Sequence, residues 1–185
     1  MKRLSEILNS PTKVVVESTK EETIAEATKQ DNNTIIDLLK NALKEELNAW
    51  YGYIIVKEYV AGPERTNVVK FFEETAKDEL EDHAYWIMER ISQLGGELSE
   101  LSMSPNSWSS AKHQYIAPEW NKNNIDVKSI LEINIKNEEG AIETYEELVK
   151  MTENTDPASN SKLKEILADE QQHLQGLKDF LADIK

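Results

Sequence analysis

The sequence predicts an all-α fold, a four-helix bundle made of two antiparallel hairpins that a long crossover joins. Apolar side chains recur at alternating spacings of three and four residues in four segments, which is the pattern of a helix with one buried face. The 185 residues include only six Gly and five Pro, and 30% of them are charged, which suits long helices better than strands. We expect an N-terminal arm over residues 1–31 and the bundle over residues 32–185.

Residues 1–31 show no sustained hydrophobic period. The stretch SEIL (5–8) suits a short helical turn, and KVVVE (13–17) suits a short extended piece. We interpret this segment as an arm that docks on a neighbouring chain or stays mobile.

The first predicted hairpin joins two helices at Gly62 and Pro63, which stop the first of them. That helix begins at Asn33, and its buried stripe is Ile36, Leu39, Leu43, Glu46, Trp50 and Tyr53. The second helix ends at Gly95-Gly96, and its stripe is Val69, Phe72, Ala76, Leu80 or Glu79, His83, Ile87 and Leu94.

A polar stretch over about residues 97–125 separates the hairpins and contains His113. It is long for a link, so we expect it to cross the molecule and to have room for a short helix. Asp126 is the expected N-cap of the third helix, whose stripe is Leu131, Ile135, Glu138, Ile142, Tyr145 and Leu148. After a turn at TENTDPASN (152–160), the fourth helix carries Leu163, Ile166, Glu170, His173, Leu177 and Phe180.

The composition excludes several functional classes. The net charge of −14 argues against direct binding of nucleic acid or of an anionic membrane. The absence of cysteine excludes disulfides, thiolate metal sites and a thiol nucleophile. No apolar run approaches the roughly 20 residues that span a bilayer, and no signal peptide is evident, so we expect a cytoplasmic protein.

Each predicted hairpin supplies one Glu from its first helix and an acidic–His pair from its second. The two halves have nearly the same spacing, with 79 − 46 = 33 and 170 − 138 = 32. The paired residues, three or four positions apart, lie on one side of a helix. The set is Glu46, Glu79, His83, Glu138, Glu170 and His173.

Four carboxylates inside a bundle would be costly without cations, and the same helix faces offer few. A pair of divalent metal ions would neutralise them, and imidazole ligands suit iron better than calcium or magnesium. One acidic–His pair often arises by chance on a solvated surface. Two pairs at matching distances from a Glu in an apolar stripe favour a di-metal site.

At these residues the chain resembles the ferritin superfamily across about residues 33–183, and most of all bacterioferritin-like and Dps-like proteins. EELNAWYGY (45–53) looks like the first-helix segment of bacterioferritins, and ILADEQQHLQGL (166–177) looks like the fourth. NEEGAIETY (137–145) is similar to the third-helix segment of Dps-like relatives. The resemblance implies Glu46, Glu138 and His173 as ligands and Glu170 as a bridging ligand.

The resemblance also implies a ferroxidase, in which two Fe(II) ions are oxidised by O2 or H2O2 and ferric mineral collects inside a protein shell. It places Tyr53 on a tyrosine near the metals, where it acts as a redox-active residue or packs in the core with its hydroxyl satisfied.

The second helix departs from the family pattern, which is Glu-x-x-His. Leu80 stands three residues before His83, and Glu79 stands four before it. A helix can absorb one extra residue as a π-bulge, so we keep Glu79 and His83 as ligands. Asp82 is the alternative carboxylate to Glu79, and Glu139 is the alternative to Glu138.

Two further departures concern haem and the shell. Bacterioferritin's haem-binding methionine is replaced by Leu80 or Glu81, so we expect no haem. A fifth helix has no room after the fourth, which favours the smaller Dps-like homo-oligomer of twelve subunits.

The leading hypothesis is therefore an iron-storing or iron-detoxifying ferroxidase with two Fe ions per chain, for which Mn or Zn can substitute. The alternative is a di-manganese catalase or another di-metal oxidase on the same fold. A non-enzymatic DNA-protecting assembly is a third hypothesis, which the charge of −14 disfavours. The sequence leaves open the oxidant and the choice between iron and manganese.

Overall fold

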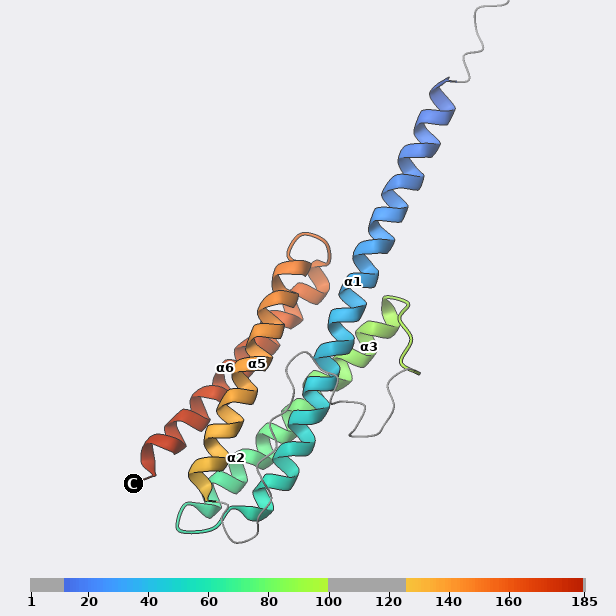
Figure 1. Cartoon of the computed structure of the whole chain (residues 1–185). Coiled ribbons are helices and arrows are strands. Elements are labelled where there is room, and N and C mark those ends of the chain that lie inside the picture. Colours follow the sequence, from blue (N-terminus) through green and yellow to red (C-terminus); the bar gives the residue numbers. More distant parts are fainter. Residues whose placement is uncertain (1–11, 100–125, 185) are drawn as a thin grey trace, which may run out of the picture. The chain divides into compact units, whose positions relative to one another are not determined.

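The computed structural model describes residues 12–99 and 126–184, and these residues form helices and turns without a strand (Figure 1). Four long helical segments make the bundle, so the predicted all-α fold is confirmed. They are α1 (Thr12–Val56), the continuous run of α2 (Arg65–Lys77), η2 (Asp78–Ala84) and α3 (Tyr85–Gln93), then α5 (Val127–Thr152) and α6 (Pro157–Asp183). No helix of the described part is both long and apolar enough to cross a bilayer.

The chain divides into two compact units, Met1–Thr34 and Ile35–Lys185. In the first unit, α1 already begins at Thr12, so the expected extended piece at residues 13–17 and the expected helix start at Asn33 are both wrong. No Gly or Pro interrupts the chain from Thr12 to Tyr51, and nothing there breaks a helix that has begun. The turn expected at residues 5–8, the link over residues 100–125 and His113 lie outside the described residues.

The first hairpin turns where the sequence predicts. Gly62 adopts a φ of +96°, a backbone angle that residues other than glycine rarely adopt. Pro63 follows it, and α2 begins two residues later. At the other end, Gly95 adopts a φ of +83° and its amide donates to the Ser92 carbonyl at 3.0 Å. This left-handed residue ends α3.

Each of the two helices of the second hairpin begins with an aspartate N-cap. The Asp126 side chain accepts from the Ser129 amide at 2.7 Å, which confirms the predicted N-cap of α5. Asp156 caps α6 through the Ser159 amide at 3.2 Å, and Pro157 occupies the first helical position. Arg90 of α3 donates to Asp156 at 2.7 Å, and this contact ties the two hairpins together.

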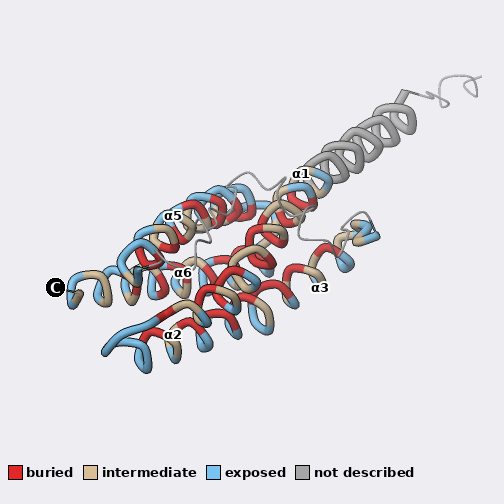
Figure 2. The backbone as a smooth tube through the Cα atoms, turned by 60° about the horizontal axis from the view of Figure 1, so that its bottom comes forward, coloured by how far each residue is buried: buried red, intermediate tan, exposed pale blue. Residues whose placement is uncertain are grey.

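Two apolar clusters fill the bundle, one towards each end of the four helices. The first contains Leu43, Ile87 and Ile166, and the second contains Tyr53 and Leu177. Figure 2 shows the buried faces of the helices turned towards one another. In α1 and α6 the acidic residues of interest lie between members of the two clusters, so the fold encloses a polar layer between two apolar ones.

Candidate metal centre

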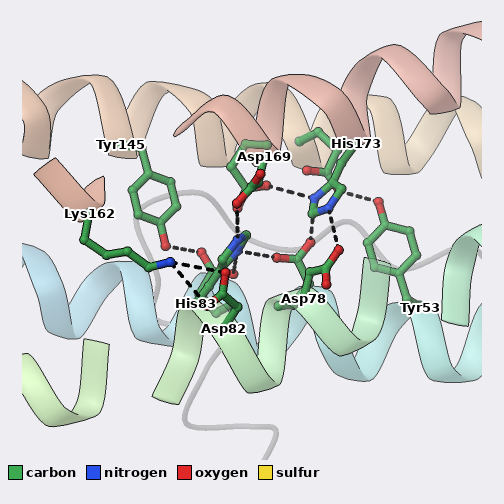
Figure 3. Close-up of polar contacts among 12 residues, drawn as sticks. Tyr53, Asp78, Asp82, His83, Tyr145, Lys162, Asp169 and His173 are labelled. Atoms are coloured by element: carbon green, nitrogen blue, oxygen red, sulfur yellow. Dashed lines mark hydrogen bonds and ion pairs between the residues drawn. The ribbon is translucent and has the colours of Figure 1, made fainter. Parts of the chain in front are cut away.

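All six residues that the sequence singles out lie in this polar layer, and none is more than 6% exposed. Each of the four helical segments contributes at least one of them: Glu46 from α1, Glu79 and His83 from η2, Glu138 from α5, and Glu170 and His173 from α6. Figure 3 shows this region of the bundle in close-up. The structure thus gathers residues that are up to 127 positions apart in the sequence (173 − 46 = 127).

The side chains form two groups whose donor atoms lie within 4.8 Å of one another. One group is Glu46, Glu79, His83 and Glu170, and the other is Glu79, Glu138, Glu170 and His173. Glu79 and Glu170 belong to both groups. Two shared carboxylates between two terminal Glu–His sets are the ligand arrangement of a di-metal carboxylate site.

The distances place both imidazoles against the shared carboxylates. The Nδ1 atom of His83 lies 2.9 Å from Glu79 Oε2 and 3.1 Å from Glu170 Oε1. The Nδ1 atom of His173 lies 3.3 Å from Glu79 Oε1 and 3.6 Å from Glu170 Oε2. The centre therefore has approximate two-fold symmetry, with one imidazole on each side.

The predicted π-bulge is present. It explains how Glu79 and His83, four residues apart, can take the place of the Glu-x-x-His pair, whose members are three residues apart. Residues 78–84 form the π-helix η2, in which Glu79 and His83 are both buried. A π turn takes one residue more than an α turn, so both side chains face the centre. The alternative ligand Asp82 is 56% exposed, and its carboxylate lies 3.2 Å from Lys162 Nζ.

The alternative to Glu138 is also at the surface. Glu139 is 52% exposed and lies 3.4 Å from Lys178 Nζ. Glu138 is 2% exposed and belongs to the second group of donor atoms. The geometry therefore favours Glu138 at this position.

Two carboxyls of the centre hold protons more tightly than usual. Burial raises the pKa of Glu46, and the charges of Glu170 and Glu79 raise it further. The same three causes raise the pKa of Glu138. Desolvation disfavours the charged form of a carboxyl, and neighbouring negative charges add to that effect.

The shared carboxylates behave in the opposite way. Burial acts to raise the pKa of Glu170, but its close contacts with the imidazoles of His173 and His83 outweigh it and lower the pKa. The pKa of Glu79 is lowered too, because its contacts with the two imidazoles outweigh burial and the charge of Glu170. Burial lowers the pKa of His83, yet the carboxylates around it raise it well above its usual range.

Asp78 and Asp169 contact the outer nitrogens of the imidazoles, and sequence reasoning missed both. His173 Nε2 lies 3.6 Å from Asp78 Oδ2, and His83 Nε2 lies 3.6 Å from Asp169 Oδ2. Carboxylates in this position orient metal-binding imidazoles. The signal in the sequence is an Asp directly before each shared Glu, in DELEDH (78–83) and in DEQQH (169–173).

Two tyrosines hold the terminal carboxylates crosswise. The Tyr53 hydroxyl of α1 donates to Glu138 of α5, and the Tyr145 hydroxyl of α5 donates to Glu46 of α1. Sequence reasoning singled out Tyr53 but took Tyr145 only as a member of an apolar stripe. The signal was the equal spacing, because each tyrosine follows its own helix's Glu by seven residues (53 − 46 = 145 − 138 = 7).

Several buried polar atoms of the centre make no hydrogen bond within the described chain. They are Glu79 Oε1, His83 Nε2, Glu170 Oε1 and His173 Nδ1. Leaving such atoms unsatisfied is costly, whereas a metal ion would bind the oxygens and the inner nitrogen directly. The donor set therefore fits a pair of metal ions that accept oxygen and nitrogen ligands.

A model of the ferritin-like domain matches residues 36–185. The chain belongs to the ferritin-like family. Among solved structures, this ferritin-like chain is similar to a dodecameric thioferritin, the bacterioferritin-related protein of Bacteroides fragilis. The two share 35% identity over 83% of this chain and 87% of the other, with a TM-score of 0.75.

Two further relatives extend the comparison. A ferritin-like diiron-carboxylate protein of Bacillus anthracis shares 26% identity over 82% of this chain and 97% of its own, with a TM-score of 0.67. The DNA protection during starvation protein of Pyrococcus furiosus is 25% identical over 158 residues, which are 85% of this chain and 82% of that protein. The matched part of this chain thus corresponds to between 82% and 97% of the length of these three relatives.

Proposed function

We propose that this ferritin-like protein is a ferroxidase that binds two iron ions per chain and stores or detoxifies iron in an oligomeric shell. The observation that carries the proposal is the pair of donor groups that share Glu79 and Glu170. The diiron-carboxylate relative from Bacillus anthracis, at 26% identity, supports iron as the metal.

Each ligand has a distinct place in the proposal. Glu46 with His83 would hold one ion, and Glu138 with His173 would hold the other, while the two remaining carboxylates would bridge them. Tyr145 and Tyr53 fix the orientation of the terminal carboxylates by donating a hydrogen bond to each. Manganese or zinc could occupy the same oxygen and nitrogen ligands.

The proposed reaction is an electron transfer from the two Fe2+ ions to an oxidant. Each ion loses one electron, and the pair reduces O2 with two protons to H2O2, or reduces H2O2 with two protons to two water molecules. Two irons held side by side supply both electrons at one place, which is the chemical advantage of a di-metal centre. Where only one Fe2+ is available to reduce H2O2, Tyr53, whose hydroxyl donates to Glu138, would supply the second electron and a proton and become a tyrosyl radical.

The proposed shell has twelve subunits, which the dodecameric relative of 35% identity supports. Sedimentation should then give a mass twelve times the 21.2 kDa of one chain.

The deciding experiment is an aerobic Fe2+ titration of metal-free protein, in which ferric absorbance is followed against iron added per chain. Oxidation that continues well beyond about two irons per chain, with the iron staying soluble, supports storage. Saturation at about two irons means oxidation without mineral. Absence of oxidation above the buffer blank would contradict the proposal.

A matched pair of variants links the reaction to the centre. Glu138→Gln removes one terminal carboxylate without changing its size, so we expect iron oxidation to fall at least tenfold. Glu139→Gln changes the exposed neighbour in the same way and should oxidise iron at the wild-type rate. Equal rates for the two variants would mean that oxidation occurs elsewhere.

A further inference from the structure

The two sides of the centre are built from corresponding residues but carry different charges. Glu79 and Glu170 occupy equivalent positions in the two hairpins, and their residue numbers differ by 91. The same difference of 91 relates the residues of α2 that precede Glu79 to their equivalents in α6. Glu74 then corresponds to Glu165, while Phe71 corresponds to Lys162 (162 − 71 = 91). Phe71 lies near His173, and Lys162 occupies the equivalent position near His83.

On the His173 side a pocket of about 260 Å³ opens between α2 and α6. The residues that line it are Phe71, Glu74, Thr75, Asp78, Asp169, Gln172 and His173. Three of them are carboxylates, and no Lys or Arg of residues 12–99 and 126–184 is part of the lining. The His173 side chain forms part of this wall and is 8% exposed, and its Nδ1 atom lies 3.3 Å from Glu79 in the centre. The pocket therefore reaches one imidazole of the centre.

Phe71 keeps this side free of a basic side chain. Its ring packs against Phe180 with 5.4 Å between the ring centroids. It also lies over Gly176, where an added Cβ would approach the ring to 2.6 Å. Lys70 is close to Glu74 at 3.5 Å, but both side chains are more than 60% exposed, so water and salt screen this pair.

On the His83 side, Lys162 supplies a positive charge. Its Nζ atom lies 3.2 Å from Asp82 Oδ1 and 3.5 Å from Glu165 Oε2, and its side chain is 23% exposed. Figure 3 shows Lys162 reaching across to Asp82, next to His83. The His83 side chain itself is fully buried. Carboxylates also lie on this side, since Asp82 and Asp169 are near His83, but the Lys162 ammonium stands among them and the imidazole is covered.

We propose that divalent cations reach the centre through the acidic pocket over His173, and that Lys162 bars the corresponding approach over His83. This inference rests on the proposed function, because Fe2+ is the cation that the reaction requires. A cleft lined with one sign of charge raises the local concentration of the opposite ion and its association rate. Glu74, Asp78 and Asp169 provide that charge at the pocket.

The test is the rate at which Co2+ binds to the metal-free full-length protein, followed by its visible absorption in a stopped-flow instrument. The variants Glu74→Lys and Glu165→Lys make the same change at corresponding positions whose side chains are 66% and 65% exposed. We expect Glu74→Lys to slow association about tenfold at low ionic strength, with the difference shrinking at high salt. Glu165→Lys should change the rate less than twofold.

A second variant tests the part assigned to Lys162. In the Glu74→Lys background, Lys162→Gln should restore at least half of the lost rate, because it removes the positive charge on the His83 side. Equal slowing by the two Glu→Lys variants would overturn the route, and absence of restoration would overturn the barrier. The final absorbance separates these results from the proposed function. A wild-type protein that binds about two Co2+ per chain supports the centre whichever route is used, and one that binds none overturns both proposals.

Discussion

Burial and neighbouring carboxylates raise the pKa of Glu46 and Glu138 in the metal-free centre, so each binds a proton more tightly than an exposed carboxyl does. A metal ion that binds them must displace those protons. The raised pKa values also mean that ionising these two groups without a metal destabilises the fold as the pH rises.

Variants of Tyr53 and Tyr145 can distinguish two roles of a tyrosine, which are orienting a carboxylate ligand and donating an electron. Tyr53→Phe and Tyr145→Phe each remove a hydrogen bond to a terminal carboxylate, so we expect both to weaken Co2+ binding by about tenfold. At saturating iron, Tyr53→Phe should oxidise Fe2+ several-fold more slowly than Tyr145→Phe and lose any tyrosyl signal in electron paramagnetic resonance. Equal rates at saturation would restrict Tyr53 to orienting Glu138.

The carboxylate ligand of η2 can be identified by a pair of amide variants. Glu79 is buried between both imidazoles, whereas Asp82 is 56% exposed beside Lys162. We expect Glu79→Gln to lower Co2+ affinity by more than about a hundredfold and Asp82→Asn to leave about two ions bound per chain. Calorimetric titration measures both quantities. The reverse result would make Asp82 the ligand.

At the scale of the element, we expect the bundle to keep its fold when one exposed residue of η2 is removed. Glu81 is exposed, and its one recorded ion pair in the described chain, with Lys77, spans 3.9 Å. Deleting Glu81 would place Glu79 and His83 three apart, as Glu170 and His173 are, and would turn the π turn into an α turn. We expect this deletion to keep two Co2+ sites and a melting temperature within about 5 °C of wild type.

Deleting Glu89 is the matched control, because it removes another exposed Glu from the same helical run. The residues that follow would rotate by about 100° around the helix axis. Ile91 is fully buried, so this rotation should cost roughly 4 kcal/mol in unfolding free energy. Similar melting of the two deletions would show that η2 is not a local insertion.

The two N-caps of the second hairpin should differ in strength. Asp126→Ala removes a cap alone and should lower the unfolding free energy by about 1 kcal/mol. Asp156→Ala also removes the hydrogen bond from Arg90 at 2.7 Å, so its cost should be about 2–3 kcal/mol. Urea unfolding at neutral pH measures both, and equal costs would mean that Arg90 adds nothing.

The contribution of Asp156 should depend on pH in a defined direction. Partial burial acts to raise the pKa of Asp156, but hydrogen bonds from Arg90 and Ser159 outweigh it and lower the pKa. A lowered pKa means that the contribution is complete above about pH 4 and is lost as the pH falls through the folded-state pKa. The stability gap between wild type and Asp156→Ala should therefore narrow only in acid.

At the scale of the whole molecule, the polar layer depends on the apolar clusters at either side of it. All six candidate ligands and both clusters lie within the unit Ile35–Lys185. We therefore expect a chain that starts at residue 33 to bind two Co2+ per chain, as the full chain does. Calorimetry on both chains tests this, and loss of binding would show that the N-terminal segment is needed for the centre.

The sequence alone determined the class of fold and placed Glu46, Glu138 and Glu170 on the buried faces of their helices. Helical period places Glu46 and Glu138 among apolar side chains, and a carboxylate in such a stripe is too costly to leave without a cation. These are local patterns, so the sequence displays them directly. The prediction of an extended piece at residues 13–17 was wrong, because the weak β preference of three valines does not interrupt a helix that no Gly or Pro breaks.

Only the tertiary structure decided which groups meet across helices. The crosswise bonds from Tyr53 to Glu138 and from Tyr145 to Glu46 join residues 85 and 99 positions apart, which no local period reveals. The unlike surroundings of the two imidazoles depend equally on packing, since Lys162 reaches Asp82 from another helix. A sequence specifies which side chains a helix buries, but the distances between helices that set charge, access and hydrogen bonding exist only in the packed bundle.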